Sequence, residues 1–480
     1  MTAVNSRRYY LHTGIGLLLM FGMGYLPPIA PLTPVGMQVG GIFLGLLYLW
    51  TMVDIMWPSL LGLAALAMSD CTNIAGVLTA SFGNSTVILM IFVLALVGVV
   101  ETAGIPDYII QWIMTRKVIE GRPWVFTIII LLGTYVTSVM AQLVAAFLFW
   151  SILYKLFEDI GYKKGDRYTK LLLFGVAYAT CLGTFLMPFH GMGLLLTGTM
   201  QSALPGSTLN YLPYIVVNLV ISILSILLYV LMMKVGFRAD VTPLRQVKTA
   251  MFEENKLPPM SRLQKFLLFY LLLMIMLLLL PSFLPKTWLL TQKLSSAGSA
   301  GIVLILFSLL CVIRVEGKSL VDFRALAHQK IAWELVFLCA MALAISSFLT
   351  KPETGITALL QQILNPIFLD KSPILFIFLL CFLAILLTNV GNNGVIAMLM
   401  MAVSCLYVGS YGIDPAIVVI LLSYCTNIAF LLPASSMFGA IAHGNDWLTA
   451  KDIYLYAVLA AVVGLVLAVF VGYPLAVFLV

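Results

Sequence analysis

The chain has 480 residues, of which 62% are hydrophobic and only 9% are charged, and its formal net charge at pH 7 is +7. A soluble domain carries about 25% charged residues, so this composition excludes a water-exposed surface over most of the chain. Lipid is therefore the expected solvent, and the length fits about a dozen spans of about 20 residues each.

Apolar runs follow one another along the chain, at 10–27, 36–53, 55–69, 86–103, 123–157, 169–200, 208–236, 264–284, 296–313, 331–349, 373–408, 413–440 and 453–479. The runs at 123–157 and 373–408 are too long for one span and have polar or small residues at their centres. Helical hairpins that enter and leave the membrane on the same side explain this pattern. Two crossing helices joined by a very short turn are the alternative. The runs thus predict an all-α polytopic membrane protein with about eleven transmembrane helices and two re-entrant helical hairpins.

The basic residues predict an orientation. With a cytoplasmic N-terminus and two hairpins that do not cross, only four of the 26 Lys and Arg residues fall outside, namely Lys286, Lys293, Lys351 and Lys371. Basic loops are retained in the cytoplasm. We therefore expect a protein of the cell's inner or plasma membrane, with its N-terminus in the cytoplasm and its C-terminus outside. Because the charges follow topology, no nucleic-acid partner is expected.

A weak internal repeat relates two halves of the chain. Residues 101–105 correspond to 352–356, and 137–139 correspond to 388–390, both at an offset of 251 positions. An odd number of crossings between the copies makes the repeat inverted, which is typical of transporters. The expected organisation is N-terminal scaffold helices, a first hairpin and broken-helix transport half, a cytoplasmic linker, second scaffold helices, and a second hairpin and broken-helix transport half. These segments cover residues 1–122, 123–236, 237–263, 264–349 and 350–480.

Polar residues gather at the centres of the two hairpins. The first tip is Thr137-Ser138-Val139-Met140-Ala141-Gln142, and the second is Thr388-Asn389-Val390-Gly391-Asn392-Asn393-Gly394. Backbone and side-chain oxygens at such tips could ligate a hard cation, and the N-termini of the hairpin helices could face an anion. The alternative is that these residues only satisfy the backbone of the tips.

Two further polar breaks interrupt apolar runs. One spans residues 183–193 and contains Pro188 and His190, and the other spans 423–439 and contains Pro433. Proline with small residues frees backbone groups inside a helix, and these groups need partners. An ion or a solute is one source of partners, and a simple proline kink is the alternative. His190 could contact an anion or carry a proton, or it could be a satisfied buried imidazole.

The sequence contains no HExxH, Walker A, GxSxG or dinucleotide-binding pattern, so neither an enzyme nor a bound cofactor is expected. Transport must then draw on an ion gradient or on exchange. A channel would need a continuous polar pore lining, which the runs do not show. The alternatives kept open are a sodium/proton antiporter or another ion permease, and a membrane subunit that does not transport.

These motifs resemble the divalent anion/sodium symporter family of dicarboxylate, citrate and sulfate carriers, within the ion transporter superfamily. The resemblance rests on the run at 45–50 with Pro58 after it, on Gly104-Ile105, on Trp333-Glu334, on the second tip, and on 430–436 with His443-Gly444. The family's Ser-Asn-Thr motif becomes Met140-Ala141-Gln142 in the first tip and Gly391-Asn392-Asn393 in the second. The resemblance implies an elevator mechanism and a homodimer.

The tips and breaks, read with this resemblance, give two expected sets of residues. The substrate set is Thr137, Ser138, Gln142, His190, Asn392, Asn393, Ser435 and Ser436. The cation set is Gly183, Thr184, Thr388, Asn389, Gly391, Asn392, Thr426 and Asn427, with Na+ as the only metal considered. The expected function is secondary active transport of a small anion, a di- or tricarboxylate, by symport with Na+ or H+ or by exchange (antiport).

Overall fold

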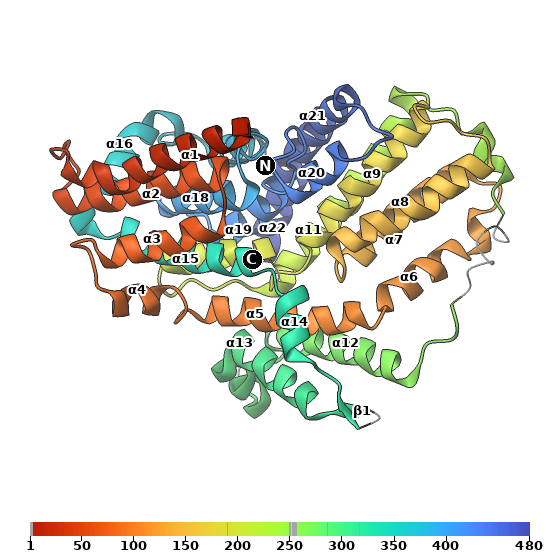
Figure 1. Cartoon of the computed structure of the whole chain (residues 1–480), viewed down its shortest axis with the longest axis horizontal. Coiled ribbons are helices and arrows are strands. Elements are labelled where there is room, and N and C mark those ends of the chain that lie inside the picture. Colours follow the sequence, from red (N-terminus) through yellow and green to blue (C-terminus); the bar gives the residue numbers. More distant parts are fainter. Residues whose placement is uncertain (1–2, 190, 249–250, 252–256, 286, 316) are drawn as a thin grey trace.

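The computed structural model describes residues 3–480 except 190, 249–250, 252–256, 286 and 316. The described part is built almost entirely from helices (Figure 1). Its two strands, β1 (Arg314–Val315) and β2 (Lys318–Ser319), form one short antiparallel pair. The expected all-α class is confirmed.

The first half of the chain runs from α1 to α11. Its helices are α1 (Ala3–Leu17), which further turns extend to Tyr25, α2 (Pro34–Met52), α3 (Met56–Ala67), α4 (Ile74–Ala80), α5 (Ser85–Thr102), α6 (Ile105–Met114), α7 (Pro123–Ser138), α8 (Gln142–Asp159), α9 (Arg167–Thr184), α10 (Gly191–Ala203) and α11 (Tyr211–Leu231).

The second half begins after the linker. Its helices are α12 (Arg262–Phe283), α13 (Leu289–Val312), α14 (Phe323–Gln329), α15 (Trp333–Leu349), α16 (Ile356–Phe368), α17 (Pro373–Thr388), α18 (Asn393–Cys405), α19 (Pro415–Cys425), α20 (Met437–His443), α21 (Ala450–Leu467) and α22 (Tyr473–Leu479).

Within the described residues, six helical segments are long and apolar enough to cross a membrane: Pro34–Met52, Ser85–Thr102, Tyr211–Gly236, Arg262–Pro281, Leu289–Val312 and Ala450–Leu479. Two bent pairs raise this number to as many as eight: α14 with α15, bent by 76°, and α16 with α17, bent by 110°. The structure thus supports a polytopic membrane protein, and the number eleven stays a prediction.

Both long apolar runs fold as two helices joined by a short turn. α7 and α8 meet at Val139–Ala141, and α17 and α18 meet at Asn389–Asn392. α7 and α17 have 16 residues each, and at about 1.5 Å per residue such a helix is about 24 Å long. The hydrocarbon core of a bilayer is about 30 Å thick. Each turn therefore lies where the predicted polar residues are, and re-entry of the hairpins on one side of the membrane stays a prediction.

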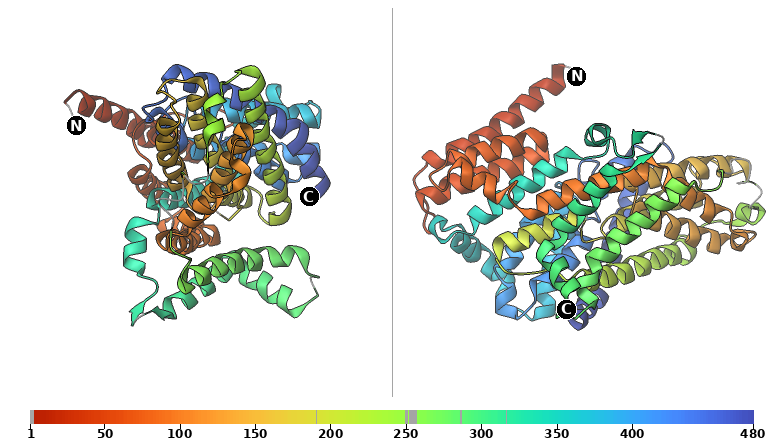
Figure 2. Two further views of the ribbon diagram at one scale, coloured as in Figure 1. Left: turned by 90° about the vertical axis from the view of Figure 1, so that its right-hand side faces the viewer. Right: turned by 90° about the horizontal axis from the view of Figure 1, so that it is seen from below.

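Buried apolar side chains form two separate clusters. We call the first the hairpin core; it joins α7, α8, α9 and α11 to α17–α22. The second, the scaffold core, joins α2–α5 to α12, α13 and α15 and also includes residues of α10 and α18. In the ribbon views, α12 and α13 extend below α5, on the opposite side from α20 and α21 (Figures 1 and 2). The fold therefore has two packed bodies.

Two short helices begin alike. α6 and α16 each follow a glycine in the left-handed region, Gly104 with φ 72° and Gly355 with φ 69°. Only glycine adopts this region without cost. Ile105 and Ile356, the first residues of these helices, are 251 positions apart, as are Gln142 and Asn393, which begin α8 and α18.

The start of α2 is fastened to the connection between α15 and α16. Thr33 donates its hydroxyl to the carbonyl oxygen of Glu353 at 2.7 Å and its backbone N–H to that of Thr354 at 3.2 Å. A Cβ added at Gly36 would lie 1.8 Å from the Thr354 carbonyl oxygen, and one at Gly355 would lie 2.1 Å from that of Pro31. The two segments therefore meet backbone to backbone.

Candidate functional site

The amide of Asn389 fastens the second hairpin to the second helix break. Its Nδ2 donates to the carbonyl oxygens of Ile385 at 2.8 Å and Ile428 at 2.7 Å. Its Oδ1 accepts the backbone N–H groups of Phe430 and Leu431, both at 3.0 Å. An amide has two donors and two acceptor positions, so all four are used within the protein. The side chain is only 3% exposed, and it is left no position for a cation.

Neighbouring residues strengthen the same contact. Thr388 donates its hydroxyl to the carbonyl oxygen of Thr426 at 2.7 Å. The backbone N–H of Asn393 donates to the carbonyl oxygen of Ser435 at 3.0 Å. Asn392 caps α18, because its Oδ1 accepts the N–H groups of Gly394 and Val395. The second tip is therefore fixed to the break between α19 and α20.

The first tip lies against the end of α9. Thr137 and Ser138 donate their hydroxyls within α7, to the carbonyl oxygens of Gly133 and Tyr135, both at 2.8 Å. A Cβ added at Gly183 would lie 2.0 Å from Ser138 Oγ and 2.2 Å from the Tyr135 carbonyl oxygen. Any larger residue at position 183 would therefore push the hairpin away from the helix break.

His443 contacts the second break but was not among the predicted site residues. Its Nε2 lies 3.2 Å from the carbonyl oxygens of both Phe430 and Leu431. Ser436 donates its hydroxyl to the carbonyl oxygen of Ala429 and accepts the N–H of Gly439. The only sequence signal for His443 was its place in the family resemblance.

A cavity of about 690 Å³ lies where the tips and the breaks come together. The predicted residues that line it are Gln142, Thr184, Asn392, Asn393, Asn427 and Ser436. Met90 of α5 and Trp333–Leu335, at the start of α15, form part of its wall. The cavity is therefore bounded by elements of both the hairpin core and the scaffold core.

Other predicted residues lie behind this lining. They are Thr137, Ser138, Gly183, Thr388, Asn389, Gly391, Thr426 and Ser435. Most of them are buried and join hairpin tips to helix breaks, so the structure places them as support for the wall. His190 lies outside the described residues.

The lining is largely apolar, with several amide and hydroxyl side chains and almost no charge. Among the described residues that line the cavity, Glu334 is the only one with a charged side chain. The first residues of five helices also lie in the wall: Gln142 of α8, Gly191 of α10, Trp333 of α15, Asn393 of α18 and Met437 of α20. The N-terminus of a helix carries a partial positive charge and free N–H groups. The site thus offers amides, hydroxyls and helix N-termini to a ligand.

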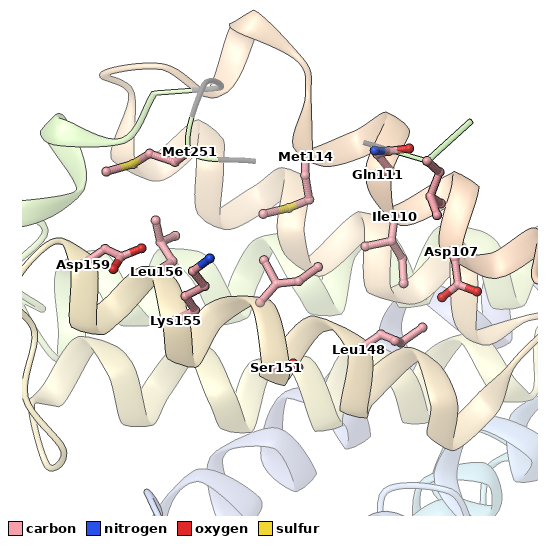
Figure 3. Close-up of a pocket in the computed structure, with 12 residues that line it drawn as sticks. Asp107, Ile110, Gln111, Met114, Leu148, Ser151, Lys155, Leu156, Asp159 and Met251 are labelled. Atoms are coloured by element: carbon pink, nitrogen blue, oxygen red, sulfur yellow. The ribbon is translucent and has the colours of Figure 1, made fainter. Parts of the chain in front are cut away.

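A second pocket, of about 320 Å³, lies between α6 and α8 (Figure 3). Its wall carries Asp107 on α6 and Lys155 and Asp159 on α8, among apolar side chains such as Ile110 and Leu156. Burial is the main cause that raises the pKa of the Asp107 carboxyl above its usual value. None of the predicted site residues lines this pocket.

A comparison with protein families found one that matches this architecture. The sequence profile of the citrate transporters matches residues 45–405, a range that includes both hairpins and the first helix break. A search of curated proteins found no match to the chain. The match to an anion-carrier profile confirms the resemblance inferred from the motifs. Because the profile covers more than half of its length, the chain belongs to the citrate transporter family.

Proposed function

We propose that the protein is a secondary active transporter that carries citrate or a similar di- or tricarboxylate across a membrane. The observation that carries this proposal is the cavity shared by both hairpin tips and both helix breaks. Its volume of about 690 Å³ lies within the range of small-molecule sites, about 300–1,000 Å³. The family match supports an anion as the solute.

The wall can hold carboxylates without a basic side chain. Five helices, α8, α10, α15, α18 and α20, begin at the cavity, and helix N-termini favour anions. Asn392, Asn393 and Gln142 add amides there. Thr184, Asn427 and Ser436 place side-chain oxygens in the same wall, where a co-transported Na+ or H+ could reduce the charge of the ligand. Coupling to such a cation, or exchange of one anion for another, is therefore part of the proposal.

The two cores suggest how the solute crosses. The hairpins and broken helices belong largely to one packed body, and the cavity lies where this body meets the scaffold core. We infer an elevator, in which the hairpin core moves as a rigid body against the scaffold core of a homodimer. The equal spacing of the starts of α6 and α16, and of α8 and α18, supports an inverted repeat.

We also infer the conformational state of this structure. The distribution of Lys and Arg predicts that the segment near Ile55 and the segment 331–335 lie at the cytoplasmic ends of their helices. Both segments line the cavity. The proposal therefore assigns the structure to an inward-facing state.

Counterflow in proteoliposomes tests the function. Vesicles loaded with unlabelled citrate should accumulate labelled citrate transiently above equilibrium, because a carrier exchanges solute at one site. A channel would only equilibrate the label. Equilibration without overshoot, or no carboxylate movement at all, would contradict the proposal. Vesicles with purified Asn392→Ala protein are the matched control.

A further inference from the structure

We propose that Glu334 sets the charge preference of the cytoplasmic mouth of the cavity, disfavouring ligands in proportion to their negative charge. This inference rests on the proposed function and adds a specificity-determining residue to it. Glu334 lies in the first turn of α15, is exposed, and lines the cavity between Trp333 and Leu335.

No nearby group neutralises this carboxylate within the described part of the chain. Glu334 forms no ion pair there, and no Lys or Arg lines the cavity. Lys330, four residues earlier, is held by Glu101 at 3.1 Å. The walls around the mouth, including Ile55, Met56 and Ile331, are apolar. Low-dielectric walls focus the field of a charge into the opening between them.

Glu334 lies where the electric field of its carboxylate acts on ligands that enter or leave the cavity. α15 belongs to the scaffold core, whereas α7, α8 and α17, which lead to or from the hairpin tips, belong to the hairpin core. In an elevator the scaffold stays in place, so the carboxylate faces each anion that enters or leaves from the cytoplasm. The energy of one fixed charge with a ligand is proportional to the ligand's charge, so a trianion is disfavoured more than a dianion.

The corresponding position in the first half of the chain carries no charge. The residue 251 positions before Glu334 is Gly83, just before Asn84, the N-cap of α5. Under the proposed inverted repeat, the external mouth therefore lacks an equivalent carboxylate. The charge preference should act on substrate presented from the cytoplasm and not on substrate presented from outside.

Stabilisation of α15 is the competing explanation for an acidic residue at this position. A carboxylate in the first turn favours a helix through the helix dipole, and Glu334 lies in the first turn of α15. Such a role predicts that neutralising Glu334 lowers the melting temperature and changes the transport of all anions equally. A charge-selecting role predicts an effect that depends on the charge of the ligand.

The test measures kcat/KM in oriented proteoliposomes for the trianion tricarballylate and the dianion succinate, at about pH 8, where carboxyl groups are ionised. With substrate on the cytoplasmic side, Glu334→Gln should raise the tricarballylate-to-succinate ratio about threefold, the Coulomb effect of one charge through water over about 6 Å. Salt at about 1 M should abolish the difference by screening. Substrate presented from outside should give the same ratio in both proteins.

Two control variants separate the outcomes. Glu334→Asp should keep the wild-type ratio because it keeps the charge, and Glu158→Gln should keep it because Glu158 is exposed on α8 and does not line the cavity. An unchanged ratio in Glu334→Gln, or an equal change for both anions with a lower melting temperature, overturns the inference alone. A wild-type protein that moves neither anion nor citrate overturns the proposed function as well.

Discussion

Asn389 and His443 contact opposite backbone groups of the same two residues, Phe430 and Leu431. Asn389 Oδ1 accepts the N–H groups of Phe430 and Leu431 at 3.0 Å, and His443 Nε2 lies 3.2 Å from their carbonyl oxygens. These groups lie in the break between α19 and α20, where no helix can satisfy them. Two side chains from different elements therefore supply the hydrogen-bond partners that a helical turn would otherwise supply. They fix the position of the break beside the cavity.

Replacing Asn389 should disrupt this break. Asn389→Asp keeps the acceptors but removes both donors, so the carbonyl oxygens of Ile385 and Ile428 lose their partners in a buried place. Each lost partner should cost about 1–3 kcal/mol. We expect a lower melting temperature in detergent and loss of citrate counterflow. The control is Asn73→Asp at the N-cap of α4, where Asp caps equally well. Equal melting temperatures for both variants would contradict the assignment.

Asn392 should contribute to transport beyond its role as a cap. Asn392→Ala removes both the cap of α18 and an amide in the cavity wall, whereas Asn392→Ser keeps a capping hydroxyl. A lost cap costs about 1 kcal/mol, so only the Ala variant should melt at a lower temperature. Both variants should lose citrate counterflow. Normal counterflow in Asn392→Ser would show that the residue acts only as a cap.

Gly183→Ala should separate the first hairpin from α9. The added methyl group would overlap Ser138 Oγ and the Tyr135 carbonyl oxygen, and relief of such overlap costs about 1–3 kcal/mol. Reduced counterflow and a lower melting temperature are expected. Gly14→Ala is the matched control, because nothing lies within 4 Å of an added Cβ there. A Gly183→Ala protein as active and stable as the control would refute the close contact.

Transport should depend only weakly on sodium. Val139, Met140 and Ala141 at the first tip carry no side-chain oxygen, and Thr137 and Ser138 direct their hydroxyl protons to carbonyl oxygens of their own helix. Because Na+ needs several oxygen ligands, as other hard cations do, replacing it with choline should slow counterflow less than about twofold. A steep, saturable sodium requirement would show that a complete cation site exists. The uptake rate against sodium concentration decides this.

The hairpins could be predicted because their signal is local. Two apolar runs were too long for one span, and the structure turns each of them where Gln142 and Asn392 interrupt the apolar sequence. Six predicted residues line one cavity, and all six were identified from the polar residues that interrupt the apolar runs.

The contacts that hold the site residues in place could not be predicted, because the residues that form each contact are far apart in the chain. Asn389 was expected to bind a cation, but its amide is saturated by backbone groups about 40 residues later, and no local pattern encodes that pairing. The sequence around Glu334 shows only that it lies near the start of an apolar run. Only the packing of α15 against the broken helices shows that it lines the cavity.

The joint between Thr33 and Glu353 has a consequence for biosynthesis. The two residues are 320 positions apart, and a chain grows from its N-terminus at about 5–20 residues per second. The start of α2 is thus made well before the backbone that completes it. During that interval Thr33 and Gly36 lack the backbone of Glu353 and Thr354 that they contact in the finished fold, so this joint can close only after the later helices reach the bilayer.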